Sequence, residues 1–460
     1  MTSSSEHNSP TRNGAREVAR RVLARVADGS WATPALAGEL ARGNLSDSDR
    51  ALAMELVHGV LKRRTRLDRA LAALAPRGLG SLDVRVLDAL RMAAHQILFL
   101  RVPAHAAVDD AVGAIRRTRG ERLAGFVNAL LRKLATAGEP PLPQTSDKIA
   151  DLAIAESLPR ELVERVRASV GDEELAAALA AFNAPSPTWL RANTLRTTRD
   201  ALADRLRGER DKITLTTTPL APDALAARGG GDLFSTQSAA AGDFSAQDLG
   251  AQLVTRLVAP LAGEHILDAC AGVGGKSTHL AALCRDAAHI DAADLARRKL
   301  DLADDLAHRL GVKSVRCVVA DLTSPTFGGA PIAAAYDRVL LDAPCSGLGV
   351  LRRHPEARWR VSADDIRALA ALQDRLLDNL APRVRPGGVL VYAVCSFTEE
   401  EGPQRIARFL AAHPDFTVEP ATSVDKNFAP CMHEDGSLRT WPHRHDADAF
   451  YAVRMRRAPR

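Results

Sequence analysis

The chain of 460 residues contains few cysteine and few aromatic residues. No C-x-x-C pair and no histidine cluster with metal-ligand spacing is present, so we expect free thiols and neither disulfides nor a metal site. Aromatic residues are sparse (4 Trp, 3 Tyr and 11 Phe), and stacking of bases along an extended strand should therefore not dominate nucleic-acid binding. The six cysteines all lie in the second half: Cys270, Cys284, Cys317, Cys345, Cys395 and Cys431.

Long apolar segments are also missing. No uncharged apolar run reaches the 18 or so residues that a membrane span needs. The polar start, Met1 to Asn13, lacks the apolar centre of a signal peptide. We therefore expect a cytoplasmic protein without membrane contact, with residues 1–12 as a disordered tail.

The overall composition is that of a folded protein, with 46% hydrophobic and 25% charged residues. The length predicts two to four domains. The formal net charge is only +5, but residues 1–139 hold 22 basic and 14 acidic residues. A surface that contacts phosphates needs such an excess, although a solvated helix face produces the same pattern more often.

Hydrophobic periodicity divides the chain into parts. Val18, Val22 and Val26 have helical spacing, and the pattern stays helical through the first part, which predicts an all-helical domain over residues 13–139. Three prolines mark a linker over 140–146. Residues 147–243 predict a small α+β subdomain with short strands over 188–193 and 213–216. Residues 244–460 alternate strands with helices.

The last part predicts an α/β fold with a doubly wound, Rossmann-like parallel sheet. Each expected strand leads to a polar or reactive residue, and open parallel sheets bind ligands beyond the carboxyl ends of their strands. We therefore expect these side chains to line one crevice. The strands are 265–269, 289–294, 315–321, 336–342 and 388–395, and the residues are Asp268, Asp294, Asp321, Asp342 and Cys395.

A glycine-rich turn follows the first of these strands and opens a helix, whose free N–H groups suit an anion. Dinucleotide and triphosphate motifs both fit it only in part, because a third glycine is missing for the first and Cys270 replaces a glycine of the second. Asp294 suits a ribose diol and Asp321 an adenine amino group, which favours S-adenosylmethionine as the cofactor. The turn consists of Cys270, Ala271, Gly272, Val273, Gly274, Gly275 and Lys276.

Two cysteines follow neighbouring expected strands. Cys345 lies three residues after Asp342, and Cys395 ends the last strand. A thiolate that adds to C6 of cytosine makes C5 nucleophilic enough to take a methyl group, and a carboxylic acid such as Asp342 could balance charge near N3. A second cysteine could assist release of the product. The residues alone do not say which cysteine has which role.

These motifs resemble the bacterial small-subunit (16S) ribosomal RNA cytosine-C5 methyltransferases of the Sun family, which carry an N-terminal NusB-like domain. The resemblance rests on residues 268–276, 342–347 and 395–401, and in the helical part on 90–98, 102–108 and 126–132. It implies that Cys395 is the nucleophile, that Cys345 assists product release, and that the glycine-rich turn with Asp294, Asp321 and Asp342 holds the cofactor. The chain departs from the family pattern at Gly272-Val273 and at Asp448-Ala449-Phe450.

The predicted function is methylation of C5 of a cytosine in 16S ribosomal RNA, with ribosomal RNA as the partner. Transfer RNA is the alternative substrate. A catalytically silent RNA-binding factor would leave both cysteines unexplained, and a nucleotide triphosphatase using Gly275-Lys276-Ser277 is disfavoured by Cys270. The target nucleotide, protein partners and oligomeric state are not predicted.

Overall fold

The computed structural model describes residues 14–43 and 45–459, which form two compact units. The first unit extends to Glu164 and also includes Arg353–Trp359, while the second consists of Arg165–Arg352 and the chain from Arg360 onward. The tail predicted for residues 1–12 lies outside the described residues. Within the described ranges, no helix is both long and apolar enough to cross a membrane.

The first unit is all helical, as its periodicity predicts. Ser46 caps α3, because its hydroxyl accepts a hydrogen bond from the Asp49 backbone N–H at 3.2 Å. A long helix, α9 (Arg160–Asn183), then leads into the second unit and is interrupted at Gly171, where φ is 77°. The helices of the first unit are α1 (Ala15–Ala27), α2 (Ala32–Arg42), α3 (Asp47–Lys62), α4 (Arg64–Ala72), α5 (Val84–Phe99), α6 (Ala104–Arg119), α7 (Glu121–Ala137) and α8 (Lys148–Ala155).

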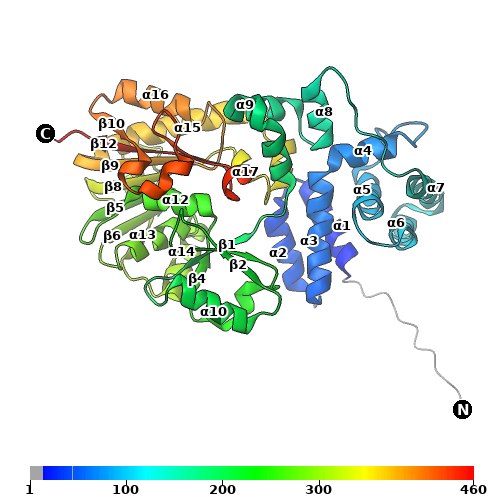
Figure 1. Ribbon diagram of the computed structural model, residues 1–460, viewed down its shortest axis with the longest axis horizontal. Coiled ribbons are helices and arrows are strands. Elements are labelled where there is room, and N and C mark those ends of the chain that lie inside the picture. The colour runs from blue at the N-terminus through cyan, green and yellow to red at the C-terminus, as the bar shows by residue number, and fades with distance from the viewer. Residues whose placement is uncertain (1–13, 44, 460) are drawn as a thin grey trace, which may run out of the picture. The chain divides into compact units, whose positions relative to one another are not determined.

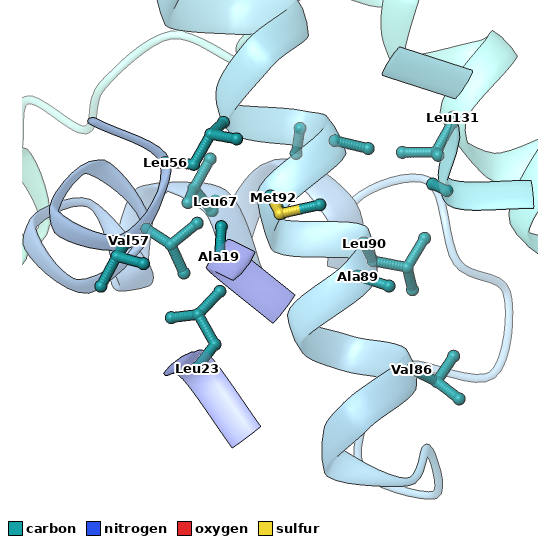
Figure 2. Close-up of a cluster of buried hydrophobic side chains, with 14 of the residues drawn as sticks. Ala19, Leu23, Leu56, Val57, Leu67, Val86, Ala89, Leu90, Met92 and Leu131 are labelled. Atoms are coloured by element: carbon teal, nitrogen blue, oxygen red, sulfur yellow. The ribbon is translucent and has the colours of Figure 1, made fainter. Parts of the chain in front are cut away.

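The core of the first unit forms around α5. Leu90 and Met92 of this helix are fully buried, together with Leu56 of α3 and Leu131 of α7. Figure 2 shows these side chains around α5, with Leu23 of α1 beside them. The helices are therefore joined by one continuous apolar cluster.

A short segment from far along the chain completes this unit. The 3₁₀ helix η4 (Pro355–Trp359) packs against α3, where the Trp359 indole N–H donates to the Leu61 carbonyl at 3.1 Å. The Glu356 carboxylate is buried and accepts from the Ala32 backbone N–H at 2.7 Å. This segment follows the 342–349 motif after only a few residues and nevertheless belongs to the helical unit.

The second unit begins with a small antiparallel sheet in the order β2-β3-β1-β4. Its core contains Leu190, Leu202, Leu225 and Phe244. The strands predicted near 188 and 213 are present, while β3 and β4 were not predicted. The elements are β1 (Thr188–Ala192), α10 (Arg199–Glu209), β2 (Thr214–Thr217), β3 (Ala224–Arg228), α11 (Gln237–Ala240) and β4 (Phe244–Ala246).

The large sheet has the order β10-β12-β9-β8-β5-β6-β7, and β11 pairs with β12. Strands β5 to β9 are parallel, as predicted. Beyond β9 the sheet continues with strands that were not predicted, in which β12 pairs antiparallel with β9, β10 and β11. The predicted strand over 315–321 ends at Val319, and the one over 388–395 begins earlier, at Val384. The strands are β5 (His265–Ala269), β6 (His289–Asp294), β7 (Val315–Val319), β8 (Tyr336–Asp342), β9 (Val384–Val394), β10 (Phe416–Glu419), β11 (Leu438–Thr440) and β12 (Phe450–Arg457).

Helices cover both faces of the large sheet, which gives the doubly wound architecture that the sequence predicts. Ile266 points into the core with α12, α13 and α14, whereas its neighbour Leu267 points into the core with α15 and α16. Figure 1 shows α15 and α16 on one side of the strands and α12, α13 and α14 on the other. The helices are α12 (Leu249–Val258), α13 (Gly275–Leu283), α14 (Arg297–Leu310), α15 (Ala363–Leu380), α16 (Pro403–Ala412) and α17 (Pro442–His445).

Candidate active site

The parallel strands bring the predicted strand-end residues to one edge of the large sheet. β5 pairs with β6 and β8, β6 pairs with β7, and β8 pairs with β9, all in parallel. Asp268, Asp294 and Asp342 lie at the carboxyl ends of their strands, and Asp321 and Cys395 follow β7 and β9 within two residues. All five therefore share the edge at which open α/β sheets bind ligands.

The glycine-rich loop connects β5 to α13 by a sharp backbone turn. Cys270, Gly272 and Gly274 have positive φ values of 62°, 58° and 78°. A Cβ on Gly274 would lie 2.7 Å from the Cβ of Ala303 in α14, so a side chain at this position would collide with that helix. The Val273 side chain, at one of the departures from the family pattern, is 50% exposed.

Asp294 fixes this loop against the end of β6. One carboxylate oxygen accepts from the Gly272 N–H at 3.0 Å and the other from the Ala296 N–H at 2.8 Å. The Ala271 N–H donates to the Ala293 carbonyl at 2.9 Å. The loop backbone is therefore held in place at the site predicted for the cofactor.

Asp268 lies fully buried beneath the same loop. Its Oδ2 accepts from the Ser277 hydroxyl at 2.6 Å, while its Oδ1 is buried without a hydrogen-bond partner. Burial raises the pKa of Asp268 to about 7, although the Ser277 hydrogen bond opposes this shift. The carboxyl group thus lacks one partner in a site that is otherwise closely hydrogen-bonded.

Asp321 lies beside the end of β6, because the preceding Ala320 N–H donates to the Asp294 carbonyl at 3.1 Å. Its Oδ1 accepts from the backbone and the hydroxyl of Thr323 at 3.0 and 2.5 Å. The Thr323 hydrogen bonds lower the pKa of Asp321 and favour its ionised form. A carboxylate acceptor is therefore available beyond Asp294.

Lys276 joins the glycine-rich loop to the 342–349 motif. Its Nζ lies 2.6 Å from Asp342 Oδ2 and 5.6 Å from the centre of the Phe450 ring. Burial disfavours the ammonium, but the charge and hydrogen bond of Asp342 outweigh this effect and raise the pKa of Lys276. Lys276, which was predicted to hold the cofactor, thus contacts a residue predicted to be catalytic.

Cys345 and Cys395 meet at the ends of β8 and β9, with their Sγ atoms 3.3 Å apart. The hydrogen bond to Cys395, burial and the charge of Glu401 raise the pKa of Cys345 well above its ordinary value. One of the two sulfurs donates a hydrogen bond to the other, and either thiol can be the donor.

A buried carboxylate, Glu401, joins the two cysteine loops. It is 0% exposed and accepts from the Ser346 N–H and hydroxyl at 2.7 and 2.5 Å. It also accepts from the hydroxyls of Ser396 and Thr398 at 2.7 and 3.0 Å. Because Ser346 and Ser396 directly follow the two cysteines, Glu401 ties both thiols into one rigid network.

The second departure from the family pattern packs against these loops. The Gly349 N–H donates to the Cys395 carbonyl at 2.9 Å, and the Ala449 N–H donates to the Gly349 carbonyl at 3.0 Å. A Cβ on Gly349 would lie 1.9 Å from the Ala449 carbonyl oxygen, which leaves room only for glycine. The segment before β12 therefore belongs to the wall of the site.

Sequence reasoning placed Asp268 in the crevice and quoted Glu401 as part of the family motif, but gave neither a role. The one available signal was that each of the two cysteines is followed by a serine, which pointed to a shared partner. Among the described residues, no group of three or more His, Cys, Asp or Glu side chains is placed to hold a metal ion.

Comparison with known proteins relates this site to one family. The family model described as 16S rRNA methyltransferase RsmB/F matches residues 255–456, the NusB family model matches 13–136, and a ferredoxin-like domain of RsmF/B-like methyltransferases matches 158–232. A probable ribosomal RNA small subunit methyltransferase B from Synechocystis is 34% identical and covers 93% of this chain and 96% of its own. The chain belongs to the RsmB/F family of 16S rRNA methyltransferases.

Two further relatives of this RsmB/F family member cover nearly the whole chain. The Bacillus subtilis protein with the same description is 32% identical over 96% of this chain and 98% of its own. The crystal structure of the protein PH0851 has a TM-score of 0.81 at 25% identity and covers 97% of this chain and 99% of that one. The RsmB/F family member is accordingly an RNA methyltransferase, and its family implies S-adenosylmethionine as the methyl donor.

Proposed function

We propose that the protein methylates C5 of a cytosine in small-subunit ribosomal RNA, with Cys395 as the nucleophile. The observation that carries the proposal is the 3.3 Å contact between the Cys345 and Cys395 sulfurs, directly beyond Asp342. Two thiols and a carboxylate at one sheet edge match the needs of a pyrimidine that must be activated and then released. A purely structural pair of cysteines would not need this setting.

In the proposed reaction, the Cys395 thiolate forms a bond to C6 and moves electron density to C5. S-adenosylmethionine, when bound, supplies an electrophilic methyl group to that carbon. A base then removes the C5 proton, the S–C6 bond breaks, and the C5–C6 double bond and the Cys395 thiolate are restored. The step needs no further reactant.

The contact of the two cysteines supports this division of roles. Cys345 Sγ lies 3.3 Å from Cys395 Sγ, so it is placed to assist proton transfer during release of the product. Asp342 is proposed to balance charge near N3 of the ring, and Lys276 holds its carboxylate in place at 2.6 Å.

The edge of β5, β6 and β7 fits the proposed cofactor. The buried Oδ1 of Asp268 has no partner, and the loop from Cys270 to Gly275 offers a glycine-lined backbone against which a ligand can lie. Asp294 would hold the ribose hydroxyls and Asp321 the adenine amino group, because carboxylates accept hydrogen bonds from both. Gly272, Gly274 and their neighbours would contact the rest of the molecule through the backbone.

Small-subunit ribosomal RNA is proposed as the substrate because the full-length relatives are described as small-subunit ribosomal RNA methyltransferases and because the NusB-like part is shared. These relatives are bacterial, so the reaction would occur in the cytoplasm, where the substrate is made. Transfer RNA is the alternative to exclude.

The experiment combines labelled S-adenosylmethionine with unmodified small-subunit ribosomal RNA or transfer RNA and measures label at cytosine C5 and protein–RNA adducts on denaturing gels. Cys395→Ala should lose methylation without forming an adduct, whereas Cys345→Ala should accumulate one. Cys317→Ala, a partly buried thiol on β7, is the matched control and should behave like the wild type. An adduct that survives Cys395→Ala, or wild-type label only in transfer RNA, would overturn the nucleophile or the substrate respectively.

A further inference from the structure

The second unit contains a pocket of about 510 Å³ that the proposed reaction does not use. It is lined by the loop before β1, by the end of β3, by α17 and by Arg352, which follows the loop that contains Cys345. We name it the Arg228–Arg352 pocket after its two converging arginines. Its wall also contains Pro185, His445 and Asp446.

Two guanidinium groups share one carbonyl and one carboxylate in this pocket. Arg352 Nη2 donates to the Pro185 carbonyl at 2.6 Å and to Asp446 Oδ1 at 2.8 Å. Arg228 donates to the same carbonyl at 3.2 Å and to Asp446 Oδ2 at 2.5 Å. The pair of arginines therefore keeps one positive charge in excess.

Arg352 has hydrogen-bond donors to spare. Its side chain is only 3% exposed, yet Nε and Nη1 are buried without a partner. An arginine with unused donors is costly to bury, so the contacts to Pro185 and Asp446 do not saturate this guanidinium. The third arginine of the wall, Arg444, is already bound to Glu174 by two hydrogen bonds of 2.6 and 2.7 Å.

The backbone connects this pocket closely to the thiols. The Gly349 N–H donates to the Cys395 carbonyl, and the Gly349 carbonyl accepts from Ala449. Arg352 lies three residues after Gly349 and Asp446 three residues before Ala449, and three residues span at most about 11 Å. A ligand in the pocket is thus within a few nucleotides of a base held at Cys395.

We propose that the Arg228–Arg352 pocket binds a backbone phosphate of the substrate RNA close to the target cytosine. The inference rests on the proposed function, because it takes RNA to be the substrate at Cys395. The planar guanidinium fork matches phosphate oxygens, and Asp446 occupies that place in the free protein. The phosphate displaces Asp446 from one or both arginines, so Asp446 is an internal competitor of the RNA.

This arrangement predicts that substitutions of Arg228 and of Asp446 change the affinity for RNA in opposite directions. Arg228→Ala removes a phosphate ligand and should raise the Kd for small-subunit ribosomal RNA about tenfold. It should also reduce the slope of log K against log salt by about 0.7 in magnitude. Asp446→Asn removes the competitor and should lower the Kd. Asparagine tolerates the left-handed backbone at position 446, where φ is 52°.

The test measures equilibrium binding of unmodified small-subunit ribosomal RNA between 50 and 200 mM KCl, about the range over which phosphate contacts are resolved. A second ion pair of similar exposure, Arg408 with Asp378, provides matched controls. Arg408→Ala and Asp378→Asn should leave Kd and slope unchanged. Thermal unfolding of each variant checks that it is folded.

The pocket proposal fails if Arg228→Ala and Asp446→Asn both weaken binding, as a purely structural ion pair would, or if neither differs from its control. Binding does not require methyl transfer. If the two variants show these opposite shifts but the wild type labels no cytosine, the proposed function is overturned and the phosphate site stands.

Discussion

Two fully buried carboxylates lie at the edge where the parallel strands end, and their surroundings differ. Glu401, beneath the cysteine loops, accepts hydrogen bonds from Ser346, Ser396 and Thr398. Asp268, beneath the glycine-rich loop, has Ser277 as a partner and one buried oxygen without any. A buried polar group stabilises a fold only when it is satisfied. The hydrogen bonds of Glu401 therefore stabilise the two cysteine loops, whereas Asp268 keeps an unused acceptor, which we propose the bound cofactor completes.

The largest expected effect is the loss of stability when Glu401, the fully hydrogen-bonded carboxylate, is replaced. Glu401→Ala leaves several buried donors of the two cysteine loops without an acceptor, and should lower the free energy of unfolding by about 3–5 kcal/mol. Glu401→Gln, which keeps the size and one oxygen, should cost less. Urea unfolding measures both changes. A loss below about 1 kcal/mol for the alanine variant would mean that the network does not hold the loops.

Asp268, the carboxyl group with an unused oxygen, should make the free energy of unfolding depend on pH. Its pKa is raised to about 7, so the folded protein binds more protons than the unfolded chain from pH 4 to 7. Stability attributed to this group is therefore present at low pH and falls as pH rises, by up to about 1.4 kcal/mol per pH unit. Asp268→Asn should remove that part of the slope when unfolding is followed from pH 4 to 8, and equal slopes would contradict the assignment.

Ser277, the hydrogen-bond partner of Asp268, allows a second test of this ionisation. Ser277→Ala removes the hydrogen bond of 2.6 Å to Asp268. It should lower the free energy of unfolding by about 1.5 kcal/mol at pH 8, where Asp268 is ionised. At pH 5 the loss should be smaller, because the carboxyl group is protonated there. Thermal unfolding at the two pH values measures the difference, and a loss that does not change with pH would argue against ionisation of Asp268.

A helix cap in the other unit provides the smallest effect and a reference. Ser46→Ala removes the cap of α3 and should cost about 1 kcal/mol. The loss should be the same at pH 5 and pH 8, because no titrating carboxyl of the active site is involved. Calorimetry of this variant beside Ser277→Ala checks that the pH dependence belongs to the glycine-rich loop.

Much of the sheet could be predicted because its strands are short apolar runs that lead to polar residues. The limits of β5, β6 and β8 agree with prediction. β3 (Ala224–Arg228) was not predicted, because its alanines favour helix locally. It becomes a strand only by pairing with β1 and β2. β9 begins before Gly388 because Arg385, Pro386 and Gly387 continue the strand, although proline and glycine usually interrupt one.

The candidate site shows the same limit. The residues at strand ends could be placed at one edge, since parallel strands align their carboxyl ends. The ion pair of Lys276 with Asp342, the contact of the two sulfurs and the network of Glu401 each join separate loops. Their geometry depends on how β8 lies beside β5 and β9, and residue spacing does not encode this. The roles of the two cysteines came from family resemblance alone, and they stay a prediction.

Because the helical unit includes the segment Arg353–Trp359, the chain cannot be cut at one point into the two units. It follows the 342–349 motif, contributes the buried Glu356 and the Trp359 indole to the helical unit, and leads on to α15. A polypeptide that starts at residue 165 would carry these seven residues without the helices that bury them. Exchange of the helical unit between relatives would for the same reason have to include this segment, which lies almost 200 residues beyond Glu164.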